Sequence, residues 1–264
     1  MVAGSRSTFR SRATVCYQKQ VRDEMAARPD ADALFPRPAG KLSPKSAQVR
    51  EVSRGLAWKI ISRYEWLGTL PTQNLNRYFG LFFGDYCGGV ACYGVGPGGH
   101  PGSFRSLSLY YDVPKDEIGY LGRGACVHWA PKGSAPRLIN YSANLLGREG
   151  CQFVVAYSDT DAGEIGTVYQ ASGWDCLGFG TCNDEWVSPE GRAHNKAMVA
   201  DVVKKNGGRI THAAAAAALE AAGWRRQKGN PKLRYLKQVG RGTRNAELSA
   251  IFKRDRVPYP KRGE

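Results

Sequence analysis

The sequence predicts an α+β fold built around a mostly antiparallel sheet. Its 264 residues are 42% apolar, which is ample for a hydrophobic core. Segments with helical periodicity are too few to cover both faces of a parallel, doubly wound sheet. Short runs of strand-forming residues alternate instead with glycine-rich turns, a pattern typical of antiparallel pairing.

In the first half of the chain, the apolar spacing predicts one helix and a β-hairpin. Apolar residues recur at helical spacing over residues 52–64. Two strand-like runs, 78–83 and 90–93, flank a turn rich in glycine, which indicates a hairpin. Residues 106–111 are interpreted as another short strand and residues 120–129 as a buried strand.

The second half alternates helices with buried strands. The run C-Q-F-V-V-A-Y at 151–157 is the clearest buried strand of the chain, and 189–208 is loosely helical. The remaining expected elements are a helix at 137–146, a short helix at 167–172, a last core strand at 176–179 and an alanine-rich helix at 212–222.

The positive charge lies in the two ends of the chain. The formal net charge is +15, of which residues 1–50 carry +6 and residues 201–264 carry +11, whereas residues 51–200 carry −2. We therefore expect a basic N-terminal arm (1–50), a core domain (51–200) and a basic C-terminal extension (201–264). Such a distribution favours docking to a polyanion, most often nucleic acid.

The cysteine spacing and the hydropathy restrict the location that we expect for the protein. The seven cysteines form no C-x-x-C pair and no zinc-type spacing with histidine, so a reducing, intracellular location fits best. No run of about 18 apolar residues is present, so no membrane partner is expected. The polar start of the chain has no apolar segment of the secretory type. The four scattered histidines predict no metal ligand set, and the sequence does not show whether a metal is bound.

Residues 122–138 have the order strand, small-residue loop, helix. Gly133, Ser134 and Ala135 lie where the helix begins, and free N–H groups at such a position suit a phosphate or pyrophosphate. Arg137 is placed to add a charge-assisted hydrogen bond. The alternative interpretation is an ordinary helix cap by Ser134.

Residues 157–174 carry a second group of polar side chains. Asp159 follows the buried strand at its C-terminal end, a usual position for a ligand-binding residue. It is a candidate general base or orienting carboxylate, and Tyr169, in the next helix, is a candidate proton donor. The alternative is an aspartate cap and a core tyrosine.

Taken together, these segments resemble the GNAT N-acyltransferase fold, whose pyrophosphate-binding loop opens the helix after a splayed strand. Within that superfamily the chain is similar to the bacteriophage Mom family of DNA-modifying proteins. The resemblance covers roughly residues 58–180 and two tail motifs. It is carried by Y-E-W-L-G (64–68), the Arg123 strand with Gly133 and Ser134, Y-S-D…G-x-x-G-T-V-Y-Q-A (157–171), K-L-R-Y-L (232–236) and Y-P-K (259–261).

The resemblance implies a GNAT-like catalytic domain at 51–200 and an enzyme that modifies the exocyclic amino group of adenine in phage DNA. The product would be N6-carbamoylmethyladenine, which shields DNA from restriction enzymes in the cytoplasm of the bacterial host. The residues that match its active site are Arg123, Ser134, Asp159 and Tyr169. Arg123 would bind the donor or the developing negative charge. Residues 133–135 and Arg137 would bind acetyl-CoA or a related acyl donor. The alanine-rich helix at 213–222 reads as an insertion.

Double-stranded DNA is the partner that this reading implies. The adenine amino group is stacked and paired in a duplex, so the base must be flipped out or met single-stranded. Tyr64 and Trp66 are candidates for stacking on the base. The basic tail supplies the remaining candidates for nucleic-acid contacts, Arg225, Arg226, Lys232, Arg234 and Tyr235. A homodimer is one option for the assembly.

Two alternatives stay open at the level of sequence. The first is a GNAT-type acetyltransferase that acts on a protein or a small-molecule amine. The second is a non-catalytic DNA-binding relative that kept the fold. The identity of the donor and the target sequence are likewise left open.

Overall fold

The computed structural model describes residues 16–71, 75–96, 104–180, 184–189, 193–195, 197–240 and 244–261. The chain forms two compact units. Unit 1 consists of Met1–Gly178 together with Leu233–Glu264, and unit 2 is the intervening segment Phe179–Lys232.

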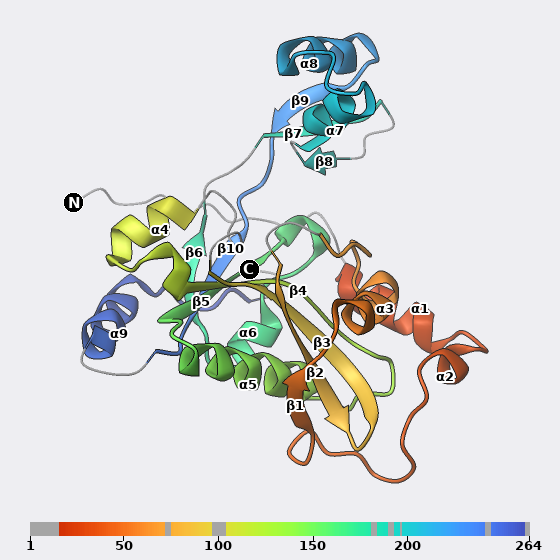
Figure 1. Cartoon of the computed structure of the whole chain (residues 1–264), viewed down its shortest axis with the longest axis vertical. Coiled ribbons are helices and arrows are strands. Elements are labelled where there is room, and N and C mark those ends of the chain that lie inside the picture. The colour runs from red at the N-terminus through yellow and green to blue at the C-terminus, as the bar shows by residue number, and fades with distance from the viewer. Residues whose placement is uncertain are drawn as a thin grey trace. The chain divides into compact units, whose positions relative to one another are not determined.

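Unit 1 is built on one seven-stranded sheet with the order β1-β2-β3-β4-β5-β10-β6 (Figure 1). Neighbours from β1 to β4 are antiparallel, β4 and β5 are parallel, and β5 and β10 are antiparallel. The predicted α+β fold with a mostly antiparallel sheet is thus confirmed. The strands are β1 (Gln48–Glu51), β2 (Arg77–Phe83), β3 (Tyr86–Gly94), β4 (Ile118–Cys126), β5 (Phe153–Ser158), β6 (Asp175–Phe179) and β10 (Leu233–Gln238).

The parallel strands β4 and β5 pair over only part of their length. Their register runs from Ile118 opposite Phe153 to Leu121 opposite Ala156, although both strands continue further. At the same level the register between β3 and β4 shifts, because Cys92 and Tyr93 face Arg123 and Leu121 and leave Gly122 of β4 as an extra residue. The C-terminal ends of β4 and β5 are therefore not joined to each other, which confirms the expected splayed layout.

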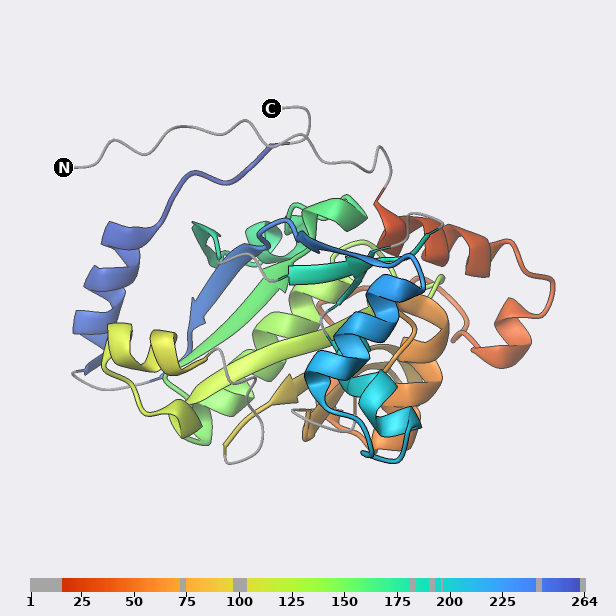
Figure 2. The same ribbon diagram turned by 90° about the horizontal axis from the view of Figure 1, so that it is seen from above.

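Helices cover both faces of this sheet. On one face, α5 and α6 pack over a core that includes Leu121, Ala156 and Tyr235. On the other face, α1 and α3 cover the β2–β4 end, and α4 and α9 cover the end with β10 and β6; Figure 2 shows these two groups at opposite ends of the sheet. The helices are α1 (Tyr17–Ala26), α2 (Ala31–Leu34), α3 (Arg54–Tyr64), α4 (Phe104–Tyr111), α5 (Ser134–Arg148), α6 (Thr167–Ala171) and α9 (Arg244–Asp255).

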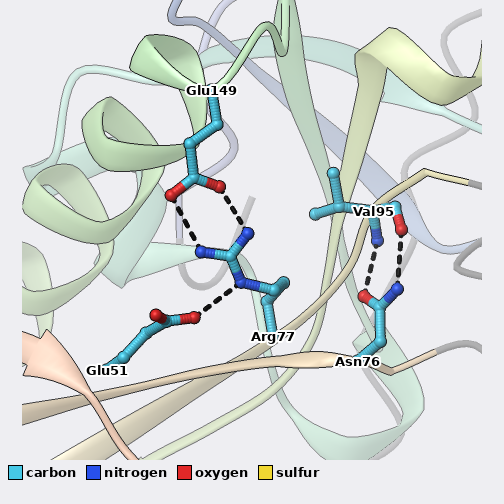
Figure 3. Close-up of polar contacts among 5 residues, drawn as sticks. All are labelled: Glu51, Asn76, Arg77, Val95 and Glu149. Carbon is cyan, nitrogen blue, oxygen red and sulfur yellow. Dashed lines mark hydrogen bonds and ion pairs between the residues drawn. The ribbon is translucent and has the colours of Figure 1, made fainter.

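An arginine on β2 ties three elements of unit 1 together. Arg77 Nε donates to Glu51 of β1 at 2.7 Å, and its two outer nitrogens bond both carboxylate oxygens of Glu149, just after α5 (Figure 3). Next to it, Asn76 exchanges two hydrogen bonds with the backbone of Val95, at 2.7 and 3.0 Å. These contacts fix the edge of the sheet to the end of α5.

Unit 2 has its own small sheet with the order β8-β7-β9, in which both pairs are antiparallel. Its elements are β7 (Asp184–Val187), β8 (Ala193–Asn195), α7 (Ala197–Lys205), α8 (His212–Ala221) and β9 (Arg225–Lys228). The N–H of Gly180 donates to the carbonyl of Lys232 at 2.9 Å, so the two ends of unit 2 lie side by side.

Most predicted elements are confirmed, but several need correction. Residues 189–208 are only partly helical, because Ala193–Asn195 form the strand β8 and α7 begins at Ala197. Residues 106–111 belong to a helix, α4, because Leu107 and Tyr111, one turn apart, are both buried. The strand at 176–179 is not the last of the core, because β10 pairs with β5 and lies between β5 and β6. Residues 233–238, expected in a basic extension, are therefore part of the main sheet, and residues 1–15 of the expected arm lie outside the described residues.

Candidate active site

Arg123 lies on β4, two residues past the last pair with β5, and is held by the loop after α3. Its Nε donates to the carbonyl of Thr69 at 3.0 Å and its Nη1 to the carbonyl of Gly122 at 2.7 Å. Glu65 Oε2 lies 3.8 Å from the same Nε, and the Glu65 side chain is only 8% exposed. That oxygen also accepts the N–H groups of Leu67 and Gly68. Arg123 is thus fixed before any ligand binds.

The start of α5 has the features of an anion site. Gly133 adopts a left-handed conformation (φ 92°), which lets the segment after β4 turn into the helix. Ser134 is 2% exposed, and its Oγ makes no hydrogen bond to any residue that the structure describes. Since a buried hydroxyl without a partner costs free energy, this atom is suited to a ligand at the helix N-terminus. It does not serve as the cap that the alternative interpretation expected.

Arg137, one turn further along α5, adds a positive charge. Its guanidinium stacks over the ring of Tyr141 at 4.3 Å, and Nη2 reaches the carbonyl of Lys45 at 3.5 Å. Its Nε is buried and has no hydrogen-bond acceptor among the described residues. With Ser134 and the N–H of Ala135, it makes up the hydrogen-bond donors predicted to bind a pyrophosphate, and this binding stays a prediction.

Asp159 follows the last residue of β5, as predicted. Its Oδ1 accepts the N–H of Asp161 at 3.1 Å, and its carbonyl accepts the N–H groups of Ala162 and Glu164. The carboxylate therefore caps the 3₁₀ turn Thr160–Ala162 at the strand end. It remains partly exposed, so a catalytic role stays a prediction.

Tyr169 lies on α6, within an aromatic cluster. Its ring centroid is 5.2 Å from that of Trp174 and 5.1 Å from that of Tyr235. Burial raises the pKa of Tyr169 well above its usual range, and the negative charge of Glu164 raises it further. The phenol is therefore a weaker acid than that of an exposed tyrosine, and its role as a proton donor stays a prediction.

The chain's C-terminal tail holds this cluster in place. The Tyr259 hydroxyl donates to the carbonyl of Trp174 at 2.8 Å, and the Gln170 amide donates to the carbonyl of Pro260 at 3.3 Å. The N–H of Val257 donates to Cys176 on β6. The Y-P-K motif thus acts through packing against α6 and β6.

Tyr64 does not offer a ring for base stacking, contrary to the expectation. It is 0% exposed, and its hydroxyl is 2.6 Å from Nδ1 of His128. His128 Nε2 in turn lies 3.0 Å from Asp32 Oδ1 of α2, and Arg22 of α1 donates to the His128 carbonyl. Burial, with the charge of Asp32, raises the pKa of Tyr64. These residues fasten the N-terminal helices to the core.

Tyr235 is likewise a core residue and not a surface contact for nucleic acid. It is 0% exposed, and its hydroxyl donates to the carbonyl of Ile165 at 2.6 Å. Trp66, by contrast, stays partly exposed, and its ring lies 5.9 Å from that of Tyr17. Of the three predicted aromatic contacts, only Trp66 presents a surface to a ligand.

The predicted basic contacts fall into both units. Arg225, Arg226 and Lys232 are exposed residues of unit 2, the first two on β9. Arg234 is a partly buried residue of β10, in unit 1. One polar residue of the site was not predicted, namely Glu65. A lone glutamate in a run of apolar and aromatic residues was the available signal.

A comparison with models of protein families shows which family the chain belongs to. The sequence model of the Mom protein family matches residues 46–261, which include Arg123, Ser134, Asp159 and Tyr169. The chain belongs to the Mom protein family. The helices α1 and α2 precede the matched region, so this Mom protein carries them outside the part that the family shares.

The comparisons with curated proteins and with solved structures say less about the chain. No curated protein matches this Mom family member. Among the solved structures that match is the ribosomal-protein-S18-alanine N-acetyltransferase from Escherichia coli, with 10% identity and a TM-score of 0.39 over 75% of this chain and 96% of that chain. Within the described part of this Mom protein, no helix is long and apolar enough to cross a membrane, and no three metal-binding side chains cluster.

Proposed function

We propose that the chain transfers a small acyl-derived group of the carbamoylmethyl type to the N6 amino group of adenine in DNA, and so protects the DNA from host restriction. Membership of the Mom family, over a region that includes all four catalytic candidates, is the observation that carries the proposal. The splayed ends of β4 and β5, with Arg123 and Asp159 on them, support it.

The adenine amino group is a weak nucleophile because its lone pair is delocalised into the ring. A positioned base and a site that excludes water are therefore needed for it to attack. Asp159, at the end of β5, would take the proton that the amino nitrogen releases. Arg123, fixed by Glu65, would stabilise negative charge that develops on the donor. Tyr169, which holds its proton, would return one to the leaving group.

An acyl-CoA-type donor fits the start of α5. Ser134 Oγ and Arg137 Nε, both buried and without partners among the described residues, would bind its pyrophosphate with the N–H of Ala135. Attack by the amino nitrogen on the activated carbon of the donor would form the new N–C bond and break the bond between that carbon and its leaving group, which departs with a proton. The residues of α5 bind and orient the donor there, and the expected role for Gly133 is the tight turn that brings this helix end to the strands.

DNA would be held by exposed basic residues. Arg225, Arg226 and Lys232 of unit 2 are placed on the surface, where they would contact phosphates without reading the sequence. Trp66 would stack on a base near the loop that holds Arg123. The adenine is expected to leave the duplex before it reacts.

The test is mass spectrometry of nucleosides from plasmid DNA co-expressed with the protein. A modified adenine is expected with the wild type and is expected to disappear with Asp159→Ala. Asp161→Ala, which changes a neighbouring carboxylate on the same turn, is the matched control. Unmodified adenine with the wild type, while the protein acetylates amines, would favour the acetyltransferase. Unmodified adenine with tight DNA binding would favour the non-catalytic relative.

A further inference from the structure

Three side chains form a row on the sheet face that α3, α4 and α9 cover. Further along the strands, this face is apolar, with Ile118 and Leu236 packed in the cluster under α4 and α9. Because alternate residues of a strand share a face, the next residues on that face toward the C-terminal ends of β4 and β5 are Tyr120 and Tyr157. Arg234 of β10 lies directly opposite Tyr157. We call Tyr120, Tyr157 and Arg234 the sheet-face row.

The sheet-face row is neither core nor open surface. All three residues are partly buried. The rings of Tyr120 and Tyr157 meet edge to face across the β4–β5 pair, with centroids 6.4 Å apart. The apolar cluster closes the row at one end. Arg123 lies on the same face, because the register shift at Gly122 places it opposite Cys92, which belongs to the cluster under α3. The row therefore leads toward the candidate active site.

Gly122 shapes the row. A Cβ built at this position would lie 2.9 Å from Cε1 of Tyr120 and 2.7 Å from Cδ2 of Leu75. The missing side chain is what allows the Tyr120 ring to lie along β4, at the register shift between β3 and β4.

The charge of Arg234 lacks an evident partner. Its Nε is buried and makes no hydrogen bond to any residue that the structure describes. Asp255, whose charge raises the pKa of Tyr111 whereas that of Arg234 lowers it, pairs with Arg254 at 2.9 Å instead. The Arg234 charge also lowers the pKa of Tyr157, although burial outweighs it and raises that pKa. A partly buried guanidinium beside phenol rings is a favourable place for an anion.

We propose that the sheet-face row binds the nucleotide that carries the target adenine, with the base against Tyr157 and Tyr120 and its phosphate on Arg234. This assignment rests on the proposed function for the identity of the base. A nucleotide combines an aromatic base with an anionic phosphate, the two groups that neighbouring phenol rings and a guanidinium bind. Arg234 thus differs from Arg225, which is fully exposed and suited to the backbone of a duplex.

The phosphate is tested with short single-stranded oligonucleotides that contain one adenine. In two of them, the phosphate on the 5′ or the 3′ side of the adenine is replaced by a neutral methylphosphonate. We expect one of these replacements to weaken binding to the wild type about tenfold or more, the size of a charge-assisted hydrogen bond. Arg234→Gln is expected to bind the charged and the neutral oligonucleotides alike. Arg225→Gln, the matched control, is expected to keep the discrimination.

The base is tested with an oligonucleotide that carries an abasic site in place of adenine. Tyr157→Leu is expected to lose about tenfold in affinity for the adenine oligonucleotide and little for the abasic one, because stacking on an aromatic ring is lost. Tyr157→Phe keeps the ring and is expected to bind as the wild type does. Circular dichroism and urea unfolding verify that the variants fold. If Tyr157→Leu does not fold, the Arg234 comparison still decides.

The proposal is overturned if Arg234→Gln retains the preference for the charged phosphate, or if Arg225→Gln loses it equally. These measurements need no donor and no turnover. An unmodified plasmid together with intact discrimination would refute the proposed function and leave the sheet-face row standing. A modified plasmid, with no preference of the wild type for the charged over the neutral oligonucleotides, would support the proposed function and refute nucleotide binding by the sheet-face row.

Discussion

Glu65 and Arg123 form an ion pair in which the carboxylate cannot turn away. Glu65 Oε2 is 3.8 Å from Arg123 Nε and at the same time accepts the N–H groups of Leu67 and Gly68. The loop after α3 therefore aims the guanidinium of β4. Glu65 is a positioning residue that acts through Arg123.

Glu65→Gln keeps an oxygen for the loop but removes the charge that faces Arg123. We expect the rate of adenine modification at saturating substrate to fall about tenfold or more, in line with the loss of one oriented charge-stabilising group. The KM for DNA should change little, since the exposed basic residues are untouched. Glu51→Gln, which alters the exposed pair with Arg77, is the control. An unchanged rate for Glu65→Gln would argue against the positioning role.

Two serines of α5 should separate donor binding from stability. Ser134→Ala is expected to raise the KM for the donor and to leave the free energy of unfolding unchanged or slightly higher, because its buried Oγ has no partner in the described residues. Ser142 Oγ, by contrast, bonds the Tyr93 hydroxyl at 2.7 Å and the Leu138 carbonyl. Ser142→Ala should therefore cost about 1–2 kcal/mol of stability without changing the donor KM. Equal effects of the two changes on KM would contradict an anion site at the helix start.

Gly166 should tolerate no side chain. A Cβ there would lie 2.3 Å from the Tyr235 ring, and the backbone has a φ of 72°. Gly166→Ala should lower the free energy of unfolding by about 3 kcal/mol, from steric overlap and backbone strain combined. Gly173 has a similar φ of 66° but nothing within 4 Å, so Gly173→Ala should lose only about 1 kcal/mol. Urea unfolding measures both, and equal losses would mean that the ring contact is unimportant.

As the pH is raised, the fold should lose stability at a lower pH than that at which Tyr169 loses its proton. Burial raises the pKa of the Cys92 and Cys126 thiols from 9.0 to about 12. Their contribution is complete below pH 9.0, and it is lost as the pH rises toward 12 because only the unfolded chain releases these protons.

The pH effect is measured as the urea midpoint at increasing pH. Each such thiol should lower the free energy of unfolding by about 1.4 kcal/mol per pH unit in that window. Cys92→Ala should show a shallower decline than the wild type. An identical decline would show that Cys92 ionises as freely in the native state as in the unfolded chain.

Salt dependence should report the phosphate contacts of unit 2. Arg225 is exposed on β9, so Arg225→Ala should weaken DNA binding for all sequences alike and lower the slope of log affinity against log salt by about 1. Arg28, equally exposed but paired with Asp30 at 2.8 Å, provides the control. Fluorescence anisotropy over a salt series gives the slopes. A change in slope with Arg28→Ala and none with Arg225→Ala would show that the phosphate contact does not lie on β9.

The elements that could be predicted were those with a local signal. The periodic apolar face of α5 and the unbroken apolar run of β5 each carry their own pattern. The strand–loop–helix order around Ser134 likewise predicted where α5 begins, whereas the anion site at that helix start stays a prediction. The strand predicted at residues 106–111 was wrong. The run S-L-S-L alternates as a strand does, but the packing of Leu107 and Tyr111 favours a helix.

The side chains whose predicted exposure was wrong are buried by contacts with residues far away in the sequence. Tyr64 is buried, and its hydroxyl shares a hydrogen bond with Nδ1 of His128, on the segment after β4. Tyr235 is buried because β10 enters the sheet next to β5, a pairing that no local pattern specifies. A tyrosine among basic residues predicts an exposed ring for nucleic acid just as well as it predicts a strand, and only the fold separates the two.

Because β6 and β10 are neighbours in the sheet and Gly180 is bonded to Lys232, the chain leaves and re-enters unit 1 at almost one point. A segment attached in this way behaves as an exchangeable cassette. Evolution could lengthen, shorten or replace it, and an engineer could graft another domain there, without altering the register of any strand that carries the catalytic candidates.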